Sequence, residues 1–242
     1  MTRLSAQATP AADNGSGRRA NARPAKGRPP TGCAPTGRPA GPKRLANEAR
    51  ILKAAEEAFA TAGFAGARTA AIARRAGVPK ANLHYYFGTK VALYRRVLEN
   101  ILEVWLGMGE SIRPGADPAE ALAAYIAAKV EHSRRRPHAS KVFANEMLHG
   151  APQVKGYLSH ELKRWVDAKA AVIDGWVAAG LMAPIDTRHL FFAIWAMTQT
   201  YADFEVQVAS VLGRARMSPR DYQAATALIT KLVLRGAALP DR

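Results

Sequence analysis

The chain has 242 residues, of which 48% are hydrophobic and 7% aromatic, and it carries a formal net charge of +16. This length and composition are those of a globular protein with room for a sizeable core, and they exclude a wholly disordered chain. A positive charge of this size favours polyanionic partners such as nucleic acid, while the single cysteine, Cys33, excludes an intrachain disulfide framework.

Residues 1–44 form a basic segment that is rich in Pro, Gly, Ala and Arg. They contain nine basic residues and one acidic residue, and so account for half of the net charge of the chain. Because few aliphatic side chains lie among them, they cannot bury enough apolar surface to offset the entropy of ordering, and we expect a disordered tail. Two interpretations stay open, a solvated tail and a basic arm that contacts DNA phosphates or the minor groove. We expect Cys33, which lies in this tail, to be an exposed thiol without a role.

From residue 45 onward the apolar residues follow the spacing of amphipathic helices, and no alternating strand pattern interrupts them. Ile51, Ala55 and Phe59 share one face of the first helix, which should end at Gly63. No apolar run reaches the length of about 18 residues that a bilayer crossing needs, and the N-terminus lacks the apolar stretch of a signal peptide. We therefore expect a cytoplasmic all-α protein with no membrane partner. Further helices are expected over residues 70–76, 79–86, 90–106, 118–135, 139–148, 154–179, 187–212 and 219–237.

Two short helices joined by a turn at Gly77 occupy the first part of this pattern. Thr69 is expected to cap the first of them. Ile72 on the first helix and Leu83 on the second can pack into one small core, which leaves the polar side of the second helix free. Lys80 lies near the N-terminus of that second helix, the end that enters the major groove in a helix-turn-helix. The alternative is a polar helical hairpin in an ordinary bundle.

The string from residue 68 to residue 90 resembles the DNA-binding signature of the TetR family of bacterial transcription regulators. The likeness rests on its threonine, its Ile-Ala and Ala-Gly-Val steps, its Leu-x-Tyr-Tyr-Phe stretch and its final lysine, and it covers about residues 45–105. The resemblance implies phosphate contacts by Thr69, His84, Tyr86 and Lys90. It implies contacts on the side of the bases by Lys80, Ala81, Asn82 and Tyr85.

The C-terminal part resembles regulators of pyrimidine utilisation within the same family. The likeness is carried by residues 145–152, 183–186 and 194–204, and it runs over nearly all of residues 45–239. It implies a small-molecule effector, a pyrimidine such as uracil, that releases the protein from DNA or modulates it there. It also implies a homodimer in which the last two helices pair across a two-fold axis, and therefore a near-palindromic operator in double-stranded DNA.

The helix expected over residues 187–212 is apolar around most of its girth, so its polar groups need partners. Trp195 and Gln199 lie one turn apart on one face of it. The amide of Gln199 offers a donor and an acceptor that match the neighbouring N–H and carbonyl groups of uracil, and Trp195 could stack on a flat ring. Asp203 and Glu146 are weaker candidates for the ligand-binding site. The alternative places Trp195 in the core and Gln199 in a dimer contact.

Enzyme motifs are missing from the sequence. It has no Walker-type phosphate loop, no nucleophile elbow and no histidine pair at metal-ligand spacing, so we expect no catalysis, no metal and no cofactor. We expect a tail over residues 1–44, a three-helix helix-turn-helix domain over residues 45–105, and a helical ligand-binding and dimerisation domain over residues 106–242.

Two other functions remain open at this point. A TetR-type repressor of another pathway would hold a different, apolar effector in a large cavity instead of a small polar site around Gln199. A basic nucleic-acid scaffold without sequence preference would owe most of its DNA affinity to residues 1–44 and would show a steep salt dependence.

Overall fold

The computed structural model describes residues 42–239. The expected tail over residues 1–44 lies outside this range except for its last three residues, and so does Cys33. The first helix begins at Pro42 rather than at residue 45. This earlier start has a local cause, because a proline suits the first turn of a helix and Lys43 and Arg44 are good helix formers.

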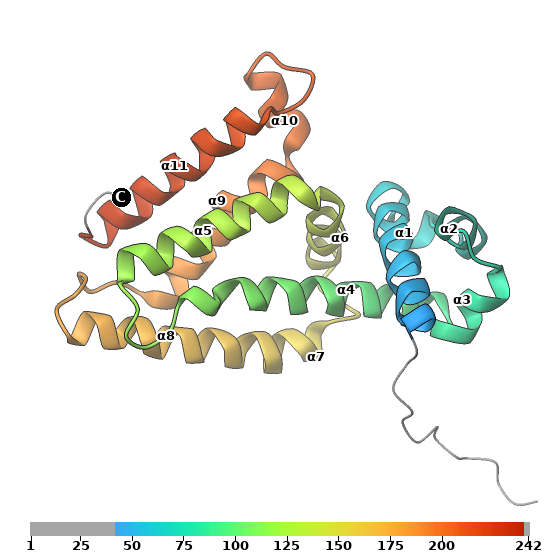
Figure 1. Ribbon diagram of the computed structural model, residues 1–242, viewed down its shortest axis with the longest axis horizontal. Coiled ribbons are helices and arrows are strands. Elements are labelled where there is room, and N and C mark those ends of the chain that lie inside the picture. The colour runs from blue at the N-terminus through green and yellow to red at the C-terminus, as the bar shows by residue number, and fades with distance from the viewer. Residues whose placement is uncertain (1–41, 240–242) are drawn as a thin grey trace, which may run out of the picture. The chain divides into compact units, whose positions relative to one another are not determined.

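The described chain begins with a helix-turn-helix arrangement (Figure 1). Its elements are α1 (Pro42–Gly66), α2 (Thr69–Ala76), α3 (Lys80–Phe87) and α4 (Lys90–Gly107). Ile51, Phe59, Ile72, Leu83 and Leu93 are almost completely buried in one core that these four helices share. Ile72 of α2 and Leu83 of α3 therefore belong to the same core, as expected, and this packing fixes the orientation of α3.

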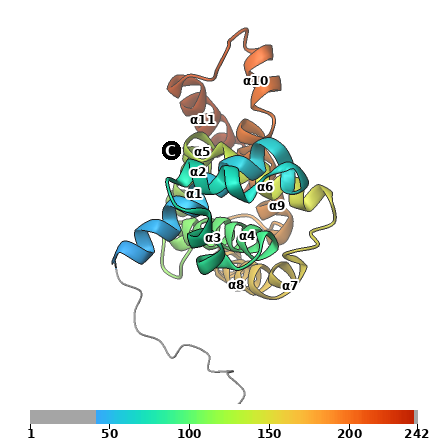
Figure 2. The same ribbon diagram turned by 90° about the vertical axis from the view of Figure 1, so that its right-hand side faces the viewer.

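The remaining described chain is helical as well, and no strand occurs between residues 42 and 239, which confirms the all-α prediction. Its elements are η1 (Met108–Ser111), α5 (Pro118–Arg135), α6 (Pro137–Leu148), α7 (Lys155–Tyr157), η2 (Leu158–Leu162), α8 (Lys163–Ala178), α9 (Thr187–Asp203), α10 (Glu205–Val211) and α11 (Pro219–Gly236). Figures 1 and 2 show α5 between α11 on one side and α4 and α8 on the other. Among these described helices, none combines the length and the apolar content that crossing a lipid bilayer would require.

Two of the expected long helices are interrupted. The helix expected over residues 154–179 contains a π turn, η2, between α7 and α8. The helix expected over residues 187–212 breaks at Phe204, whose φ of −113° and ψ of 30° leave the helical region. Ala209 is the buried residue of α10, so little packing holds α10 in line with α9. Periodicity alone could not show either break.

Candidate nucleic-acid interface and effector cavity

The turn between α2 and α3 is built on Gly77. Its φ of 63° and ψ of 38° are the left-handed values that a glycine adopts without strain. Arg50 of α1 holds this turn from outside, since its Nε and Nη2 donate to the carbonyl oxygen of Ala76 at 3.0 and 2.6 Å. Its Nη2 also donates to the carbonyl oxygen of Gly77 at 2.8 Å. This role of Arg50 could not be predicted from the sequence, because the segment that Arg50 contacts lies 26 residues further along the chain.

Replacing Arg50 with methionine is expected to lower the free energy of unfolding by about 1–3 kcal/mol. The variant keeps a long apolar stem but leaves the partly buried bond to the carbonyl of Ala76 and the exposed bond to the carbonyl of Gly77 without their charged donor. Chemical denaturation followed by circular dichroism measures the change. Lys53→Met, an exposed position on the same helix, is the matched control. Equal stability of the two variants would show that this contact does not hold the turn.

The exposed side of α3 carries most of the residues proposed to face the bases. Lys80, Ala81 and Tyr85 are exposed, and 75% of the surface of Tyr85 is accessible. Asn82 is half-buried beside them. An aromatic ring this exposed on a well-packed helix is available for contact with a partner, and a lysine at the helix N-terminus can donate to guanine or to phosphate.

The residues proposed to contact phosphates differ from one another in exposure and in hydrogen bonding. His84 is exposed, and its Nδ1 lies 3.0 Å from the carbonyl oxygen of Gly88. Tyr86 is half-buried, and its hydroxyl accepts a hydrogen bond from Asn47 at 3.4 Å. Thr69 does not cap α2, because the N-cap position is Arg68 and makes no side-chain bond there. The expectation that Thr69 is the cap was wrong, and its hydroxyl is left for other contacts.

The N-terminus of α4 also lies next to α3. Thr89 caps this helix, since its hydroxyl accepts from the N–H of Ala92 at 3.0 Å. Lys90 is half-buried, its Nζ donates to the carbonyl oxygen of Ala65 at 3.0 Å, and it lies 4.9 Å from the ring centre of Phe64. An ammonium group has three donors, so Lys90 can keep this bond and still contact a phosphate.

A small cavity of about 70 Å³ lies between α4, α5, α6, η2, α8 and α9. Its wall includes both Trp195 and Gln199, the two residues that the sequence placed on one face of a helix. The other lining residues are Leu102, Trp105, Leu106, Tyr125, Lys129, Phe143, Leu162 and Trp165. The cavity is therefore largely aromatic, and its polar groups include the amide of Gln199, the ammonium group of Lys129 and the hydroxyl of Tyr125.

Two of the tryptophans in this wall already use their N–H groups. Trp195 Nε1 donates to the hydroxyl of Tyr125 at 2.7 Å, and Trp165 Nε1 donates to the carbonyl oxygen of Leu106 at 3.0 Å. Burial raises the pKa of Tyr125, which keeps its phenol neutral. These bonds fix the rings, so the indoles offer flat apolar surfaces to a ligand rather than donors.

Lys129 also lines this cavity, although it was not among the residues predicted to bind the effector. It is only 3% exposed, and its Nζ lies 4.1 Å from the ring centre of Trp105. Burial lowers the pKa of Lys129 to about 7, and the negative charge of Asp203 opposes that shift. A signal was present in the sequence, since Lys129 follows Tyr125 by four residues and so lies on the buried face of α5.

The two weaker ligand candidates do not line this cavity. Asp203 is half-buried at the end of α9, where burial raises its pKa and its Oδ1 has no hydrogen-bond partner among the described residues. Glu146 is buried in α6, accepts from the N–H of Gln153 at 2.6 Å, and borders a separate hollow beside Tyr94. The structure thus brings Trp195 and Gln199 together and leaves Glu146 elsewhere.

The corner between α5 and α6 links the two cores. Arg136 forms an ion pair with Glu56 of α1, and its Nη2 donates to the side-chain oxygen of Asn100 of α4 at 3.2 Å. Lys129 and His132 lie three residues apart on one face of α5, and Arg136 follows directly after its last residue, at the C-cap. The helix and its C-cap residue therefore connect the cavity to the packing surface of α1.

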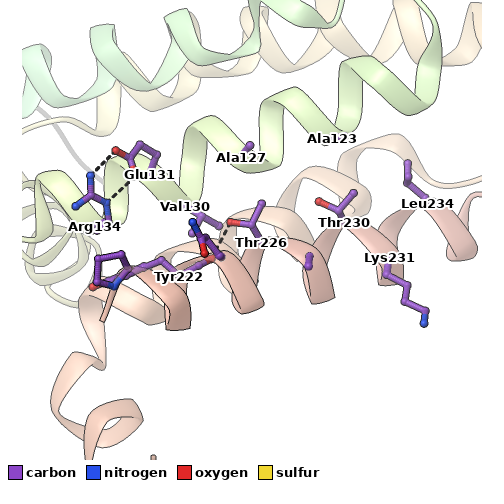
Figure 3. A pocket seen from close by; sticks show the side chains of 13 residues that line it. Ala123, Ala127, Val130, Glu131, Arg134, Tyr222, Thr226, Thr230, Lys231 and Leu234 are labelled. Carbon is purple, nitrogen blue, oxygen red and sulfur yellow. Dashed lines mark hydrogen bonds and ion pairs between the residues drawn. The ribbon is translucent and has the colours of Figure 1, made fainter. Parts of the chain in front are cut away.

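The outer surface of the C-terminal part carries two open hollows that are larger than the cavity. A groove of about 960 Å³ lies between α5 and α11. Figure 3 shows Ala127, Thr226 and Lys231 along it and the ion pair of Glu131 and Arg134 at one end. Aliphatic, polar and charged side chains line this groove together with Tyr222, in contrast to the largely aromatic cavity. A second open hollow lies between α9, α10 and α11. Its lining includes the exposed apolar side chains of Phe204, Val211, Leu212 and Leu228, and Val206 of α10 and Leu232 of α11 are exposed as well.

Comparison with known proteins covers both parts of the chain. Residues 51–97 match the model described as bacterial regulatory proteins of the tetR family, and residues 98–240 match the model described as the C-terminal region of YcdC-like protein. The HTH-type transcriptional regulator RutR of Escherichia coli K12 is 43% identical over 191 residues, which are 79% of this chain and 90% of that protein. The HTH-type transcriptional repressor NicS of Pseudomonas putida is 35% identical over 100 residues, which are 41% of this chain and 47% of that protein.

Solved structures show the same fold. A transcriptional regulator from Streptomyces coelicolor is 26% identical with a TM-score of 0.60, and the match covers 80% of this chain and 99% of that one. The ketosteroid regulator KstR2 of Mycobacterium tuberculosis is 19% identical with a TM-score of 0.61, and the match covers 78% and 93% of the two chains.

Proposed function

The chain belongs to the TetR family of bacterial transcription regulators, and we propose that it leaves its operator when a pyrimidine such as uracil enters the cavity between α5 and α9. It is a DNA-binding transcription regulator similar to RutR, and its relatives are regulators rather than enzymes. Regulators of this family bind DNA and typically act as dimers. The identity of the effector and the dimeric arrangement are the proposed parts.

The observation that carries the effector proposal is the shared cavity of Trp195 and Gln199. Its volume of about 70 Å³ is below the roughly 150 Å³ of a cavity that holds one benzene ring, so a single small ring would enter with a slight outward movement of the walls, whereas a bulky apolar effector would need far more space. Its flat aromatic walls suit stacking, and the amide of Gln199 can donate and accept along the edge of a pyrimidine. A small site with few polar groups therefore supports the pyrimidine over the effector of another pathway.

The DNA-binding proposal rests on the exposed side of α3 and on the dimer that would present two copies of it. The apolar side chains exposed on α9, α10 and α11 support a dimer through this surface, since apolar area of this kind is usually covered by a partner. Two α3 helices related by a two-fold axis would then bind the two halves of a near-palindromic operator.

Release from DNA would follow from a population shift. A ligand stabilises the conformation in which the cavity fits it best. The C-cap residue of α5, Arg136, connects that cavity to α1 through its ion pair with Glu56. A movement of this corner would change the distance between the two α3 helices of a dimer, which lowers the affinity for an operator of fixed spacing.

Isothermal titration calorimetry with uracil, thymine and cytosine tests the effector proposal. We expect at least one pyrimidine to bind the wild-type protein, and Gln199→Ala to bind it about five- to 150-fold more weakly, because the ring loses partners for its buried polar edge. Gln223→Ala, an exposed glutamine on α11, is the matched control and should bind normally. If no pyrimidine binds the wild-type protein at millimolar concentration, the proposed effector is wrong.

A further inference from the structure

The basic segment over residues 1–44 is the feature of the chain that neither α3 nor the effector cavity explains. From residue 14 to residue 47 the sequence carries eight basic residues and no acidic residue. Arginine predominates among them, since only Lys26 and Lys43 are lysines. A run of positive charge of this kind attracts a polyanion, and the operator DNA that α3 is proposed to bind is one.

The structure places the end of this segment beside α3. Arg44, in the first turn of α1, is exposed, and its guanidinium group lies 6.0 Å from the ring centre of Tyr86. Asn47, one turn further along α1, donates to the hydroxyl of the same tyrosine at 3.4 Å. The ring of the exposed Tyr85 lies 5.5 Å from that of Tyr86. Because the basic segment runs directly into α1, it joins the folded chain next to the helix that is proposed to enter the major groove.

One short sequence, Gly-Arg-Pro, occurs twice in the basic segment, at residues 27–29 and 37–39, ahead of the described residues. The glycine adds no side chain, and the proline favours extended backbone at the arginine before it. Each arginine is therefore carried by a stretch of chain that is slim on one side and biased to be extended. Such a stretch suits the minor groove of B-DNA, which is only about 6 Å wide and accepts the extended arms of other DNA-binding domains but no helix.

Arginine is the side chain that a narrow minor groove favours. A·T-rich DNA has such a groove, and its enhanced negative potential attracts inserted arginines. A guanidinium group is more weakly hydrated than an ammonium group, so it loses less on leaving water. Arg38 can lie at most about 14 Å from Pro42, and Arg28 at most about 50 Å, since a residue spans at most about 3.6 Å. Arg38 can thus enter the minor groove beside the half-site, and Arg28 can reach the next helical turn, about 35 Å away.

We propose that the basic segment is a second DNA-binding element, in which Arg28 and Arg38 of the two Gly-Arg-Pro sequences enter the minor groove next to each half-site and select A·T pairs there. This inference rests on the proposed interface of α3, which positions the segment on the operator. It adds sequence selection at base pairs that α3 does not contact. A solvated tail would add no affinity, and a purely electrostatic arm would bind every flanking sequence equally well.

The test uses an operator that the wild-type protein selects from a random pool. Its two half-sites are kept, while the base pairs outside and between them are made A·T, G·C or inosine·C. Inosine lacks the 2-amino group of guanine, so an inosine·C pair resembles A·T in the minor groove and G·C in the major groove. Fluorescence anisotropy measures the affinity for each version. The wild-type protein should bind the A·T and inosine·C versions about fivefold or more tightly than the G·C version.

Three double variants separate a groove contact from a general effect of charge. Arg28→Ala/Arg38→Ala should bind the three versions equally, because both proposed groove contacts are lost. Arg18→Ala/Arg19→Ala is the matched control, since it removes the same charge from the segment but leaves both Gly-Arg-Pro sequences intact, and it should keep the preference. Arg28→Lys/Arg38→Lys keeps the charge, so the salt dependence of binding should stay the same while the preference falls.

The outcomes distinguish this inference from the proposed interface of α3. Equal affinity of the wild-type protein for the three versions overturns the inference and leaves that interface in place. The same conclusion follows if the inosine·C version binds like the G·C version, or if Arg28→Ala/Arg38→Ala retains the preference. An equal loss of preference in Arg18→Ala/Arg19→Ala would assign the effect to charge alone and contradict the groove contact. If the protein enriches no duplex from the pool, the inference and the interface of α3 are both wrong.

Discussion

Tyr85→Ala and Lys80→Ala are each expected to weaken binding to the operator by about five- to 150-fold, which corresponds to about 1–3 kcal/mol. Both side chains are exposed on α3, and neither belongs to the buried core, so their removal should leave the fold intact. The probe is a duplex that the wild-type protein selects from a random pool, and fluorescence anisotropy measures the affinity. Because both residues are proposed to contact bases, the salt dependence of binding should change little while the sequence preference relaxes.

Lys53→Ala is the matched control for charge, since Lys53 is exposed on α1, away from α3. Tyr85→Phe separates the ring from the hydroxyl, and retention of affinity in it would assign the contact to the ring. Binding of both alanine variants within twofold of the wild-type protein would contradict the proposed interface. A loss of affinity with a reduced salt dependence would move Lys80 from the bases to the phosphates.

The exposed side of α3 could be predicted from the sequence because it depends on local chemistry. Leu83 must be buried against Ile72, and an eight-residue helix with one buried leucine leaves the rest of its surface to polar residues and tyrosine. The left-handed turn at Gly77 and the cap at Thr89 are local too, since each involves residues at most four apart. Thr69 shows the limit of such reasoning, because a cap depends on the backbone angles of one residue rather than on the presence of a hydroxyl.

Contacts between distant segments could not be predicted in the same way. The bond of Arg50 to the turn after α2 and the ion pair of Arg136 with Glu56 join residues 26 and 80 positions apart. Lys129 lies in an apolar stripe, where a single sequence cannot distinguish a side chain that reaches solvent from one enclosed by five other elements. Trp195 and Gln199 were placed correctly on one face because they share a helix, but the partners across the cavity required the packing.

Gly109→Ala is expected to close the effector cavity. Gly109 is buried in η1, and a Cβ atom at this position would overlap the indole of Trp165, which lines the cavity and is held by its bond to Leu106. The new methyl group must push that ring into a space of about 70 Å³. We expect the free energy of unfolding to fall by about 1–3 kcal/mol, as for other overpacked cores, and uracil to bind at least about tenfold more weakly. Thermal unfolding and calorimetry measure the two effects.

Gly107→Ala provides the matched control two residues earlier. Gly107 has helical backbone angles, and a Cβ atom there would meet no heavy atom within 4 Å. Alanine should therefore leave uracil binding unchanged and raise stability by up to about 1 kcal/mol, because it restricts the unfolded chain. Since Trp165 lies outside the core shared by α1 to α4, Gly109→Ala should still bind the operator below its melting temperature, yet uracil should no longer release it. Normal release by uracil in that variant would show that the effector acts from a different site.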